Sequence, residues 1–374
     1  MYVLINRLAS LQHHYAYFVL KNCMAIPKLV YLFRCAPLWK FPDLLQQLDS
    51  DMKSALEKIT NVQLNHSQWV QSSLPVNLGG LGIRSLLDIS LPAFLSSVYG
   101  VKDFVSTLIS LRDYESEIAH FTEALSRWSE LNEDLTPENL RSQFNWDQIN
   151  SKRVASSLSF PNDTELYRFQ LLQNKMSGAW LNVVPSPCIG TLMNNDVFRT
   201  CVGLRLGTKI CHPFVCICGT QVDSLGLASI NRSSLLEPPG LFRDDGKKRP
   251  DGITYTAWEK GKALVWDATC ADSLAASNMA GRTKTPGMAS VKAANRKHAK
   301  YSKLKRNYHF VAFAVESLGL LNKIGANLIR TTGEPKSRTY LFQRVSLAIQ
   351  HGNAMCIISS IPKSTPMEEV YFVQ

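Results

Sequence analysis

Acidic residues are absent from residues 278–315, a stretch that carries many lysines and arginines. Because no carboxylate there neutralises the positive charge, the stretch favours contact with a polyanion over a basic face that is merely solvated. The whole chain carries a formal net charge of +11, which points the same way with less specificity. The imbalance predicts an anionic, phosphate-bearing partner such as a nucleic acid, and no small-molecule substrate.

The sequence also lacks a signal-peptide layout and a regular cysteine framework. Arg7, His13, His14 and Lys21 interrupt the first apolar residues, so we expect no membrane-spanning helix of about 20 residues. The nine cysteines are scattered apart from one cluster, which predicts reduced thiols in a chain of this size. These absences favour a nuclear or cytoplasmic protein.

Helical periodicity dominates the first half of the chain. Apolar residues recur at helical spacing along residues 1–70, and residues 90–185 read as further helices interrupted at Pro92, Pro137 and Pro161. A hydrophobic content of 45% over 374 residues is sufficient for two or three domains with separate cores.

Residues 251–271 read instead as a β-hairpin. Ile253, Tyr255 and Ala257 alternate with polar residues, a glycine-containing turn follows, and a second apolar run leads into Asp267. Asp251 opens the first strand. An aspartate inside an apolar strand is costly unless something pairs with it, and a divalent cation would do so.

The register of this hairpin decides whether its two carboxylates meet. A simple hairpin centred on Lys260-Gly261 pairs residue 254 with Asp267, which leaves Asp251 roughly 10 Å away along the strand. The carboxylates converge only if the turn is offset or if the first strand bends at Pro250-Asp251.

Helix and strand patterns follow the hairpin. Four basic residues lie about one turn apart, so they are expected to share one helix face: Lys292, Arg296, Lys300 and Lys303. Together with Arg306 they are the candidate nucleic-acid-binding residues. Residues 309–315 form a continuous apolar run typical of a buried central strand, which gives a β-β-α-β order. A last helix is predicted over residues 336–358, with these residues inward: Leu341, Val345, Ala348 and Ile349.

Two phrases of the hairpin carry a family resemblance. The Pro-Asp, β-turn-β, Asp pattern resembles the metal-binding core of restriction-like nucleases. Residues 245–252 and 264–270 resemble the endonuclease end of LINE-type non-LTR retrotransposon polyproteins. The resemblance implies Mg²⁺ bound by Asp251 and Asp267. In that family the catalytic lysine lies on the next helix, where Lys297 holds the matching position.

Three further residues are weaker candidates for the same site. Lys300 and Tyr301 follow Lys297 directly on the predicted helix. Glu237 would add a carboxylate from the preceding segment, although a surface glutamate before two prolines is the favoured reading of that residue.

An earlier phrase resembles the same family in the matching order. Residues 74–84, with Leu-Pro followed by Gly-Gly-Leu-Gly-Ile, resemble the segment after the reverse-transcriptase palm. The adjacent pair Asp244-Asp245 sits in a polar turn rather than an apolar hairpin, so no palm metal site is expected and the chain is not a reverse transcriptase by itself. The chain thus resembles the carboxy-terminal third of such a polyprotein.

This resemblance implies a domain order and a fold class. A helical thumb-like region would occupy residues 1–100, and a helical connector would occupy residues 101–205. A zinc-knuckle remnant would follow at 206–235 and a restriction-like endonuclease domain at 236–374. The expected class is α+β, with the helical part preceding a small α/β domain that holds a mixed sheet.

The cysteine cluster resembles the opening half of a zinc knuckle. Cys216 and Cys218 match the family, but Ala228 stands where the closing histidine belongs and no cysteine follows until Cys270. A structural zinc site needs four nitrogen or sulfur ligands, so we expect no zinc here. The other candidate ligands nearby are Cys211 and His212.

Two functions of different classes remain. The first is a Mg²⁺-dependent DNA endonuclease within a retrotransposon polyprotein fragment, which would cleave DNA with a metal-activated water. The second is a catalytically inactive remnant that binds nucleic acid, including the RNA of the element.

Overall fold

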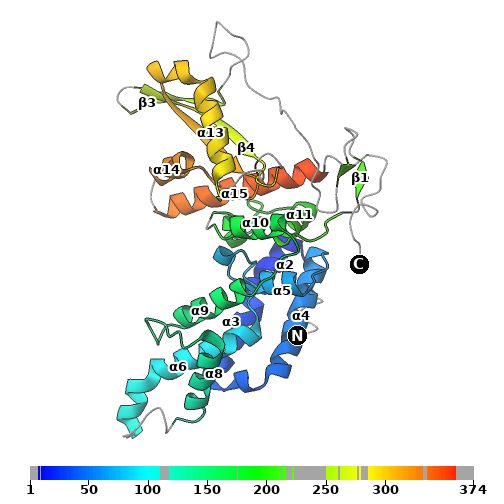
Figure 1. Ribbon diagram of the computed structural model, residues 1–374, viewed down its shortest axis with the longest axis vertical. Helices are drawn as coiled ribbons and strands as arrows, with labels where there is room; N and C mark the ends of the chain where they lie inside the picture. Colours follow the sequence, from blue (N-terminus) through cyan, green and yellow to red (C-terminus); the bar gives the residue numbers. More distant parts are fainter. Residues whose placement is uncertain are drawn as a thin grey trace. The chain divides into compact units, whose positions relative to one another are not determined.

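A computed structural model describes most of the chain. The described residues are 7–8, 10–109, 118–174, 176–211, 213–215, 221–222, 250–259, 262–275, 278, 285–331 and 335–358. They are mostly helical with a small three-stranded mixed sheet, which confirms the α+β class (Figure 1). The chain divides into two compact units. Unit 1 comprises residues 1–159, 184–209 and 372–374, and unit 2 comprises residues 160–183 and 210–371.

Unit 1 is helical throughout its described part. Its α-helices are α2 (His13–Val19), α3 (Ala25–Cys35), α4 (Pro42–Thr60), α5 (His66–Ser73), α6 (Leu86–Ile109), α8 (Phe121–Asn132), α9 (Gln143–Ser156) and α11 (Asn195–Leu206). A π-helical turn, η1 (Leu20–Met24), joins α2 to α3, and short 3₁₀ turns lie at η2 (Leu38–Lys40) and η3 (Val76–Leu78).

Aromatic residues form one core of unit 1 where α6, α8 and α9 meet. The rings of Trp128 and Trp146 meet edge to face with centroids 4.7 Å apart, and both side chains are buried. Each indole N–H donates to a backbone carbonyl at 2.7 Å, so neither polar atom is left unpaired. Pro92 lies inside α6, contrary to the expected break. The Asp88 carbonyl, to which Pro92 cannot donate, instead accepts the Asn150 side-chain amide at 3.0 Å.

The glycine-rich phrase forms a buried turn between α5 and α6. Gly79 and Gly82 have φ of 90° and 77°, a region that favours glycine. A Cβ on Gly80 would lie 2.0 Å from a backbone oxygen, so no other residue fits there. The Tyr17 hydroxyl donates to the Leu81 carbonyl at 2.6 Å. The turn is thus fixed by backbone packing, not by exposed loop residues.

One helical stretch is apolar enough to be compared with a membrane span. His13–Cys35 contains an 18-residue window of mean hydropathy 1.2, contrary to the expectation that polar residues interrupt every such window. Only 24% of that window is buried, although Tyr17, Leu20 and Phe33 lie in the core of unit 1. Length and composition alone are weak evidence in either direction.

Unit 2 holds the sheets. Its helices are α10 (Asp163–Leu172), α13 (Met288–Lys300), α14 (Lys323–Thr331) and α15 (Pro335–Ile358), with 3₁₀ turns η4 (Ala179–Asn182) and η5 (Ser302–Arg306). Its strands are β1 (Phe214–Val215), β2 (Gln221–Val222), β3 (Gly252–Glu259), β4 (Lys262–Ala271) and β5 (His309–Glu316). The predicted hairpin and the predicted apolar strand are therefore present, close to their expected bounds. The expectation of a central position for the apolar strand was wrong, because β5 lies at the edge of the described three-stranded sheet and β4 lies at its centre.

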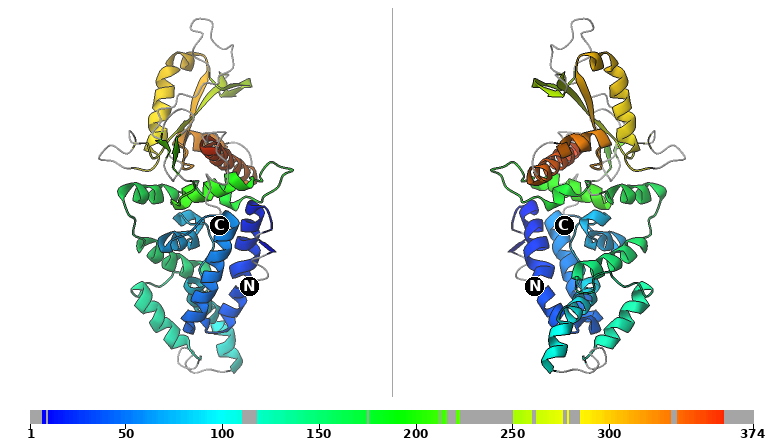
Figure 2. Two further views of the ribbon diagram at one scale, coloured as in Figure 1. Left: turned by 90° about the vertical axis from the view of Figure 1, so that its right-hand side faces the viewer. Right: turned by 90° about the vertical axis from the view of Figure 1, so that its left-hand side faces the viewer.

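The three-stranded sheet has β4 at its centre. β3 pairs with β4 antiparallel, and β5 pairs with β4 parallel. Helix α13 connects β4 to β5 and covers one face of the sheet, as Figure 2 shows from two sides. Its Ala294 packs with Val265, Phe310 and Ala312, which all point to that face. On the other face Gly325 of α14 lies against the Phe313 ring.

The last helix is present, but its buried face differs from the prediction. Leu341 is 39% exposed and Ala348 is also exposed. The buried residues of α15 are Ser346, Leu347, Gln350, Ala354 and Ile357. On this buried face the Ser346 hydroxyl accepts the backbone N–H of Trp180 in η4 at 3.2 Å.

Candidate active site

Asp267 lies at the centre of the sheet and is fully buried. It belongs to the central strand β4, where it is in register with Ala312 of β5. Its side chain is 0% exposed and points to the face that α13 covers, as does that of Val265 two residues earlier. A carboxylate in such a position must be compensated by neighbouring donors or cations.

Asp251 lies opposite Asp267 because the hairpin register shifts. Glu259 pairs with Lys262, yet Ile253 pairs with Val265 rather than with the Ala268 that an unshifted hairpin would give. Two irregularities in β3, between residues 253 and 257 and between residues 257 and 259, together account for this three-residue shift in pairing. One position further along this register, Asp251 faces Asp267.

A hydrogen bond fixes Asp251 at that end of the strand. Its Oδ2 accepts the backbone N–H of Ala268 at 2.5 Å. Directly opposed residues of an antiparallel pair have their Cβ atoms roughly 5 Å apart on the same face of the sheet. The side chain of Asp251 is exposed, in contrast to that of Asp267. The structure therefore brings together the two aspartates that the simple hairpin kept apart.

Helix α13 supplies the remaining groups of the cluster. The Lys297 Nζ lies 2.5 Å from Oδ2 of Asp267. The Tyr301 hydroxyl, at the end of α13, donates to Oδ1 of the same carboxylate at 3.1 Å. The Tyr301 ring is buried against Phe310 of β5. Asp251, Asp267, Lys297 and Tyr301 thus lie together.

The surroundings of Asp267 alter its proton affinity. Burial raises the pKa of its carboxyl above the ordinary value, and the charge of Asp251 adds to the rise. Lys297 and Tyr301 oppose the shift through their ion pair and hydrogen bond. Two carboxylates that repel one another beside a single lysine form a site with unbalanced negative charge.

The cluster fits a hard divalent cation. Both aspartates offer carboxylate oxygens, which Mg²⁺ prefers. Oδ2 of Asp267 is a buried oxygen that has no well-directed hydrogen bond within the described residues, although it lies close to the Lys297 ammonium. A group of three or more potential ligands does not occur in the described part of the chain. Water or substrate oxygens would therefore have to complete an octahedral shell, as Mg²⁺ sites commonly require.

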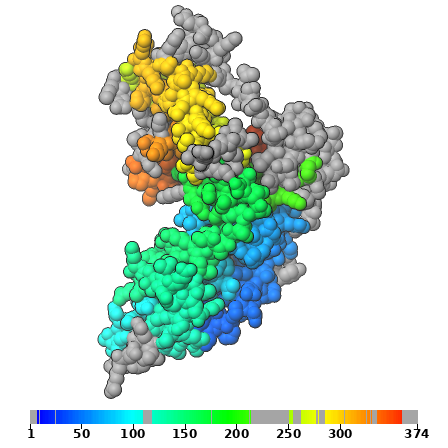
Figure 3. All heavy atoms as spheres, in the orientation of Figure 1, coloured from blue at the N-terminus to red at the C-terminus, as the bar shows by residue number. Residues whose placement is uncertain are grey.

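The predicted nucleic-acid-binding residues divide into two groups. Lys292 and Arg296 are exposed on the side of α13 that faces away from the sheet (α13 is yellow in Figure 3). The Lys300 Nζ lies 4.9 Å from the centroid of the Tyr301 ring, close enough for a cation–π contact. Helix α13 ends at Lys300, so Lys303 and Arg306 belong to η5. The expectation of one helix face for all four lysines and arginines was therefore wrong beyond Lys300.

Several predicted residues lie outside the described residues. They are Glu237, Asp244, Asp245, His212, Cys216, Cys218 and Ala228. The side chain of Lys303 is likewise not described. Cys211 is described, and its side chain is fully buried.

Sequence reasoning missed a second buried carboxylate on the same face of the sheet. Glu316 at the end of β5 is 0% exposed. Its Oε1 accepts the backbone N–H of Ser290 at 3.0 Å, and its Oε2 accepts the Ser273 hydroxyl at 3.1 Å. The signal was present in the sequence, because a glutamate ends the apolar run of residues 309–315.

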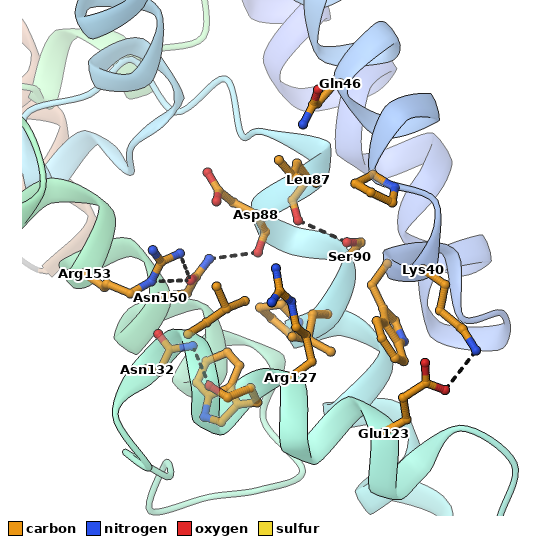
Figure 4. Close-up of a pocket in the computed structure, with 16 residues that line it drawn as sticks. Lys40, Gln46, Leu87, Asp88, Ser90, Glu123, Arg127, Asn132, Asn150 and Arg153 are labelled. Carbon is orange, nitrogen blue, oxygen red and sulfur yellow. Dashed lines mark hydrogen bonds and ion pairs between the residues drawn. The ribbon is translucent and has the colours of Figure 1, made fainter.

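Unit 1 contains a cavity of about 480 Å³ that shares no residue with this cluster. Trp39, Arg127 and Arg153 contribute to its wall, together with residues of α4 and α6 (Figure 4). Its charged groups are largely paired: Lys40 contacts Glu123 at 2.8 Å, and Arg153 donates to the Asn150 side chain. The candidate site is therefore the aspartate cluster of unit 2.

Comparison with known proteins provides no family for the chain. No protein-family model matches the sequence, and no curated protein matches it.

Proposed function

We propose that unit 2 is a divalent-metal-dependent DNA endonuclease of the restriction-like type. The observation that carries the proposal is the position of Asp251, Asp267 and Lys297. A shifted hairpin register and the helix between β4 and β5 bring these three residues to one face of the sheet. Two carboxylates and a lysine on a β-β-α-β frame correspond to what the sequence resemblance implies for a retrotransposon endonuclease.

Each residue of the cluster would have a separate role. Asp251 and Asp267 would hold Mg²⁺, which supplies an activated water and offsets the negative charge of the phosphodiester. Lys297 would orient the attacking water or donate to a phosphate oxygen as negative charge develops. The Tyr301 hydroxyl would keep the carboxylate of Asp267 in one orientation through its bond to Oδ1.

The basic residues of α13 would bind the substrate backbone. Lys292 and Arg296 are exposed on the same helix that carries Lys297. Phosphate contacts of this kind position a nucleic acid without reading its sequence. DNA bound along this helix would therefore place a phosphodiester near its carboxy-terminal end, where Lys297 lies.

A plasmid-nicking assay tests the proposal. Purified chain with Mg²⁺ is expected to convert supercoiled DNA to the open circle, and a chelator is expected to stop the reaction. Asp251→Asn and Asp267→Asn should both lose activity. Asp272→Asn is the matched control, since Asp272 is an exposed aspartate just beyond β4. Equal nicking by all four proteins would show that the activity does not arise at this cluster.

The alternative is an inactive nucleic-acid-binding remnant. One observation favours it. Lys297 already forms an ion pair with the buried Asp267, and the described residues contribute no third carboxylate to the cluster. This alternative predicts salt-dependent DNA binding by the wild-type chain without nicking at any Mg²⁺ or Mn²⁺ concentration. Detection of metal-dependent nicking that Asp267→Asn abolishes would rule it out.

A further inference from the structure

Helix α13 contacts the sheet through a single polar and apolar stripe. Ser290, Ala294, Lys297 and Tyr301 recur at helical spacing, so they lie along one face of the helix. Ala294 packs in the core between the helix and the sheet. The residues on either side of it make the polar contacts: Ser290 through its backbone N–H with Glu316 of β5, and Lys297 and Tyr301 through their side chains with Asp267 of β4.

Glu316 holds the amino-terminal end of this stripe. The N-cap residue Gly287 provides no side-chain cap, so the first turn of α13 depends on other acceptors. The Glu316 carboxylate accepts from the N–H of Ser290, the third residue of the helix, and both groups are buried. A negative charge at this end also interacts favourably with the helix dipole. The amino end of α13 is thereby fixed to the end of β5.

The spacing along the helix matches the spacing along the sheet. Ser290 and Lys297 are separated by roughly 10 Å of helix rise. On β5, Glu316 lies roughly 13 Å beyond Ala312, which is in register with Asp267. The side chain of Lys297 spans the remaining distance to the Asp267 carboxylate. A shift of α13 along its axis would therefore break the ion pair between Lys297 and Asp267.

We propose that Glu316 is a positioning residue for Lys297: by fixing the start of α13 it sets the axial position at which the ammonium meets Asp267. This inference rests on the proposed function only for its catalytic consequence. The Glu316 carboxylate bonds to Ser290 and Ser273 rather than to the aspartate cluster, and it is buried away from any bound DNA. Its loss should therefore slow cleavage without weakening DNA binding.

Three measurements on the full chain test the role. Single-turnover cleavage by Glu316→Ala at saturating DNA should be about 10–100-fold slower than that of the wild type. Loss of a residue that orients the groups of a metal site without contacting the metal usually has an effect of this size. DNA affinity should stay at the wild-type value, because Lys292 and Arg296 are unchanged. Competitive amine labelling followed by mass spectrometry gives the reactivity of Lys297 relative to that of the exposed Lys292. This labelling ratio should be several-fold higher in Glu316→Ala than in the wild type.

A matched control separates positioning from general loss of stability. Asp49 in unit 1 is also a buried carboxylate at the start of a helix: it accepts from the Ser85 hydroxyl and from the N–H of Leu86. Asp49→Ala should lower stability but leave the Lys297 labelling ratio unchanged. Glu316→Asp withdraws the carboxylate by about 1.5 Å, one C–C bond, and should give a smaller rise in that ratio.

The outcomes are distinct. A wild-type labelling ratio in folded Glu316→Ala would overturn the proposal, as would an equal rise in Asp49→Ala. If Glu316→Ala does not fold, a wild-type ratio in Glu316→Asp would overturn it instead. A raised ratio in a chain that never cleaves DNA would support the positioning role and reject the endonuclease, so the two hypotheses fail separately.

Discussion

Lys297 and Asp267 form an ion pair in which the Nζ lies 2.5 Å from an oxygen of a fully buried carboxylate. The oxygen that contacts this ammonium is also the oxygen best placed to bind a cation. Lys297 and a divalent metal should therefore compete for Asp267, although both are required for the proposed reaction. A bound metal would require the lysine to move towards water or phosphate.

Replacement of Lys297 should tighten metal binding while abolishing cleavage. A positive charge within about 4–6 Å shifts the proton affinity of a carboxylate by 1–3 pKa units, and a similar effect on a metal corresponds to at least tenfold in affinity. Titration calorimetry with Mn²⁺ should show this gain in Lys297→Met. Lys292→Met, which removes an exposed lysine from the same helix, should bind Mn²⁺ like the wild type. Weaker binding by Lys297→Met would mean that the lysine supports the metal site instead.

Asp267→Asn should stabilise the protein at neutral pH. Burial raises the pKa of Asp267 above its ordinary 3.8, so folding disfavours the ionised carboxylate relative to the unfolded chain. The stability contributed by the protonated carboxyl is fully present below the ordinary pKa and is lost as pH rises through the folded pKa. Above it the ionised carboxylate is a net cost that asparagine avoids.

Urea unfolding at several pH values measures this effect. The difference in unfolding free energy between Asp267→Asn and wild type should grow as pH rises from about 4 to 7. Asp272→Asn is the control, because it makes the same chemical change at an exposed aspartate. A difference that shrinks with rising pH would indicate that the Lys297 ion pair dominates over burial.

The basic face of α13 should determine the salt dependence of DNA binding. Each neutralised phosphate contributes about 0.9 to the slope of log affinity against log salt. Lys292→Gln with Arg296→Gln should therefore flatten the slope by about 1.8. Lys28→Gln with Lys58→Gln removes two exposed charges from unit 1 and should leave the slope unchanged. An unchanged slope in the α13 variant would place the binding surface elsewhere.

Gly252 should tolerate no larger residue. A Cβ at this position would lie 2.1 Å from the Trp266 ring, its partner across the hairpin. Gly252→Ala should lower the unfolding free energy by about 1–3 kcal/mol and should also displace the neighbouring Asp251. Gly352→Ala in α15 has nothing within 4 Å and should instead stabilise by roughly 0.5–1 kcal/mol. Chemical denaturation of both variants measures the change in unfolding free energy, which should fall in Gly252→Ala and rise in Gly352→Ala.

Purified protein should contain no stoichiometric zinc. Cys216 and Cys218 supply two ligands, Ala228 replaces the expected histidine, and a closed structural site needs four ligands. Elemental analysis decides the question. One tightly held zinc per chain that is lost in Cys216→Ser would contradict the prediction and would make Cys211 or His212 the missing ligands.

The sequence alone predicted β3, β4 and β5 and the helix between β4 and β5, and it identified the two aspartates as candidate site residues. Strict alternation identified β3, and an uninterrupted apolar run identified β5, because a strand with two covered faces carries apolar side chains throughout. Local chemistry also singled out Asp251 and Asp267, since an aspartate in an apolar strand is unusual. The α+β class expected from the family resemblance agrees with these patterns.

Only the tertiary structure decided how these parts meet. Residue spacing alone predicted a hairpin in which Asp251 and Asp267 lie apart. The two irregularities in β3 that bring them together depend on packing against neighbouring elements, so the sequence could not predict them. The buried face of α15 and the passage of α6 through Pro92 were likewise set by core contacts that outweigh local preference. Glu316 shows the same limit: the sequence displays a glutamate after a strand, but its bond to the first turn of α13 exists only because β5 and α13 pack together.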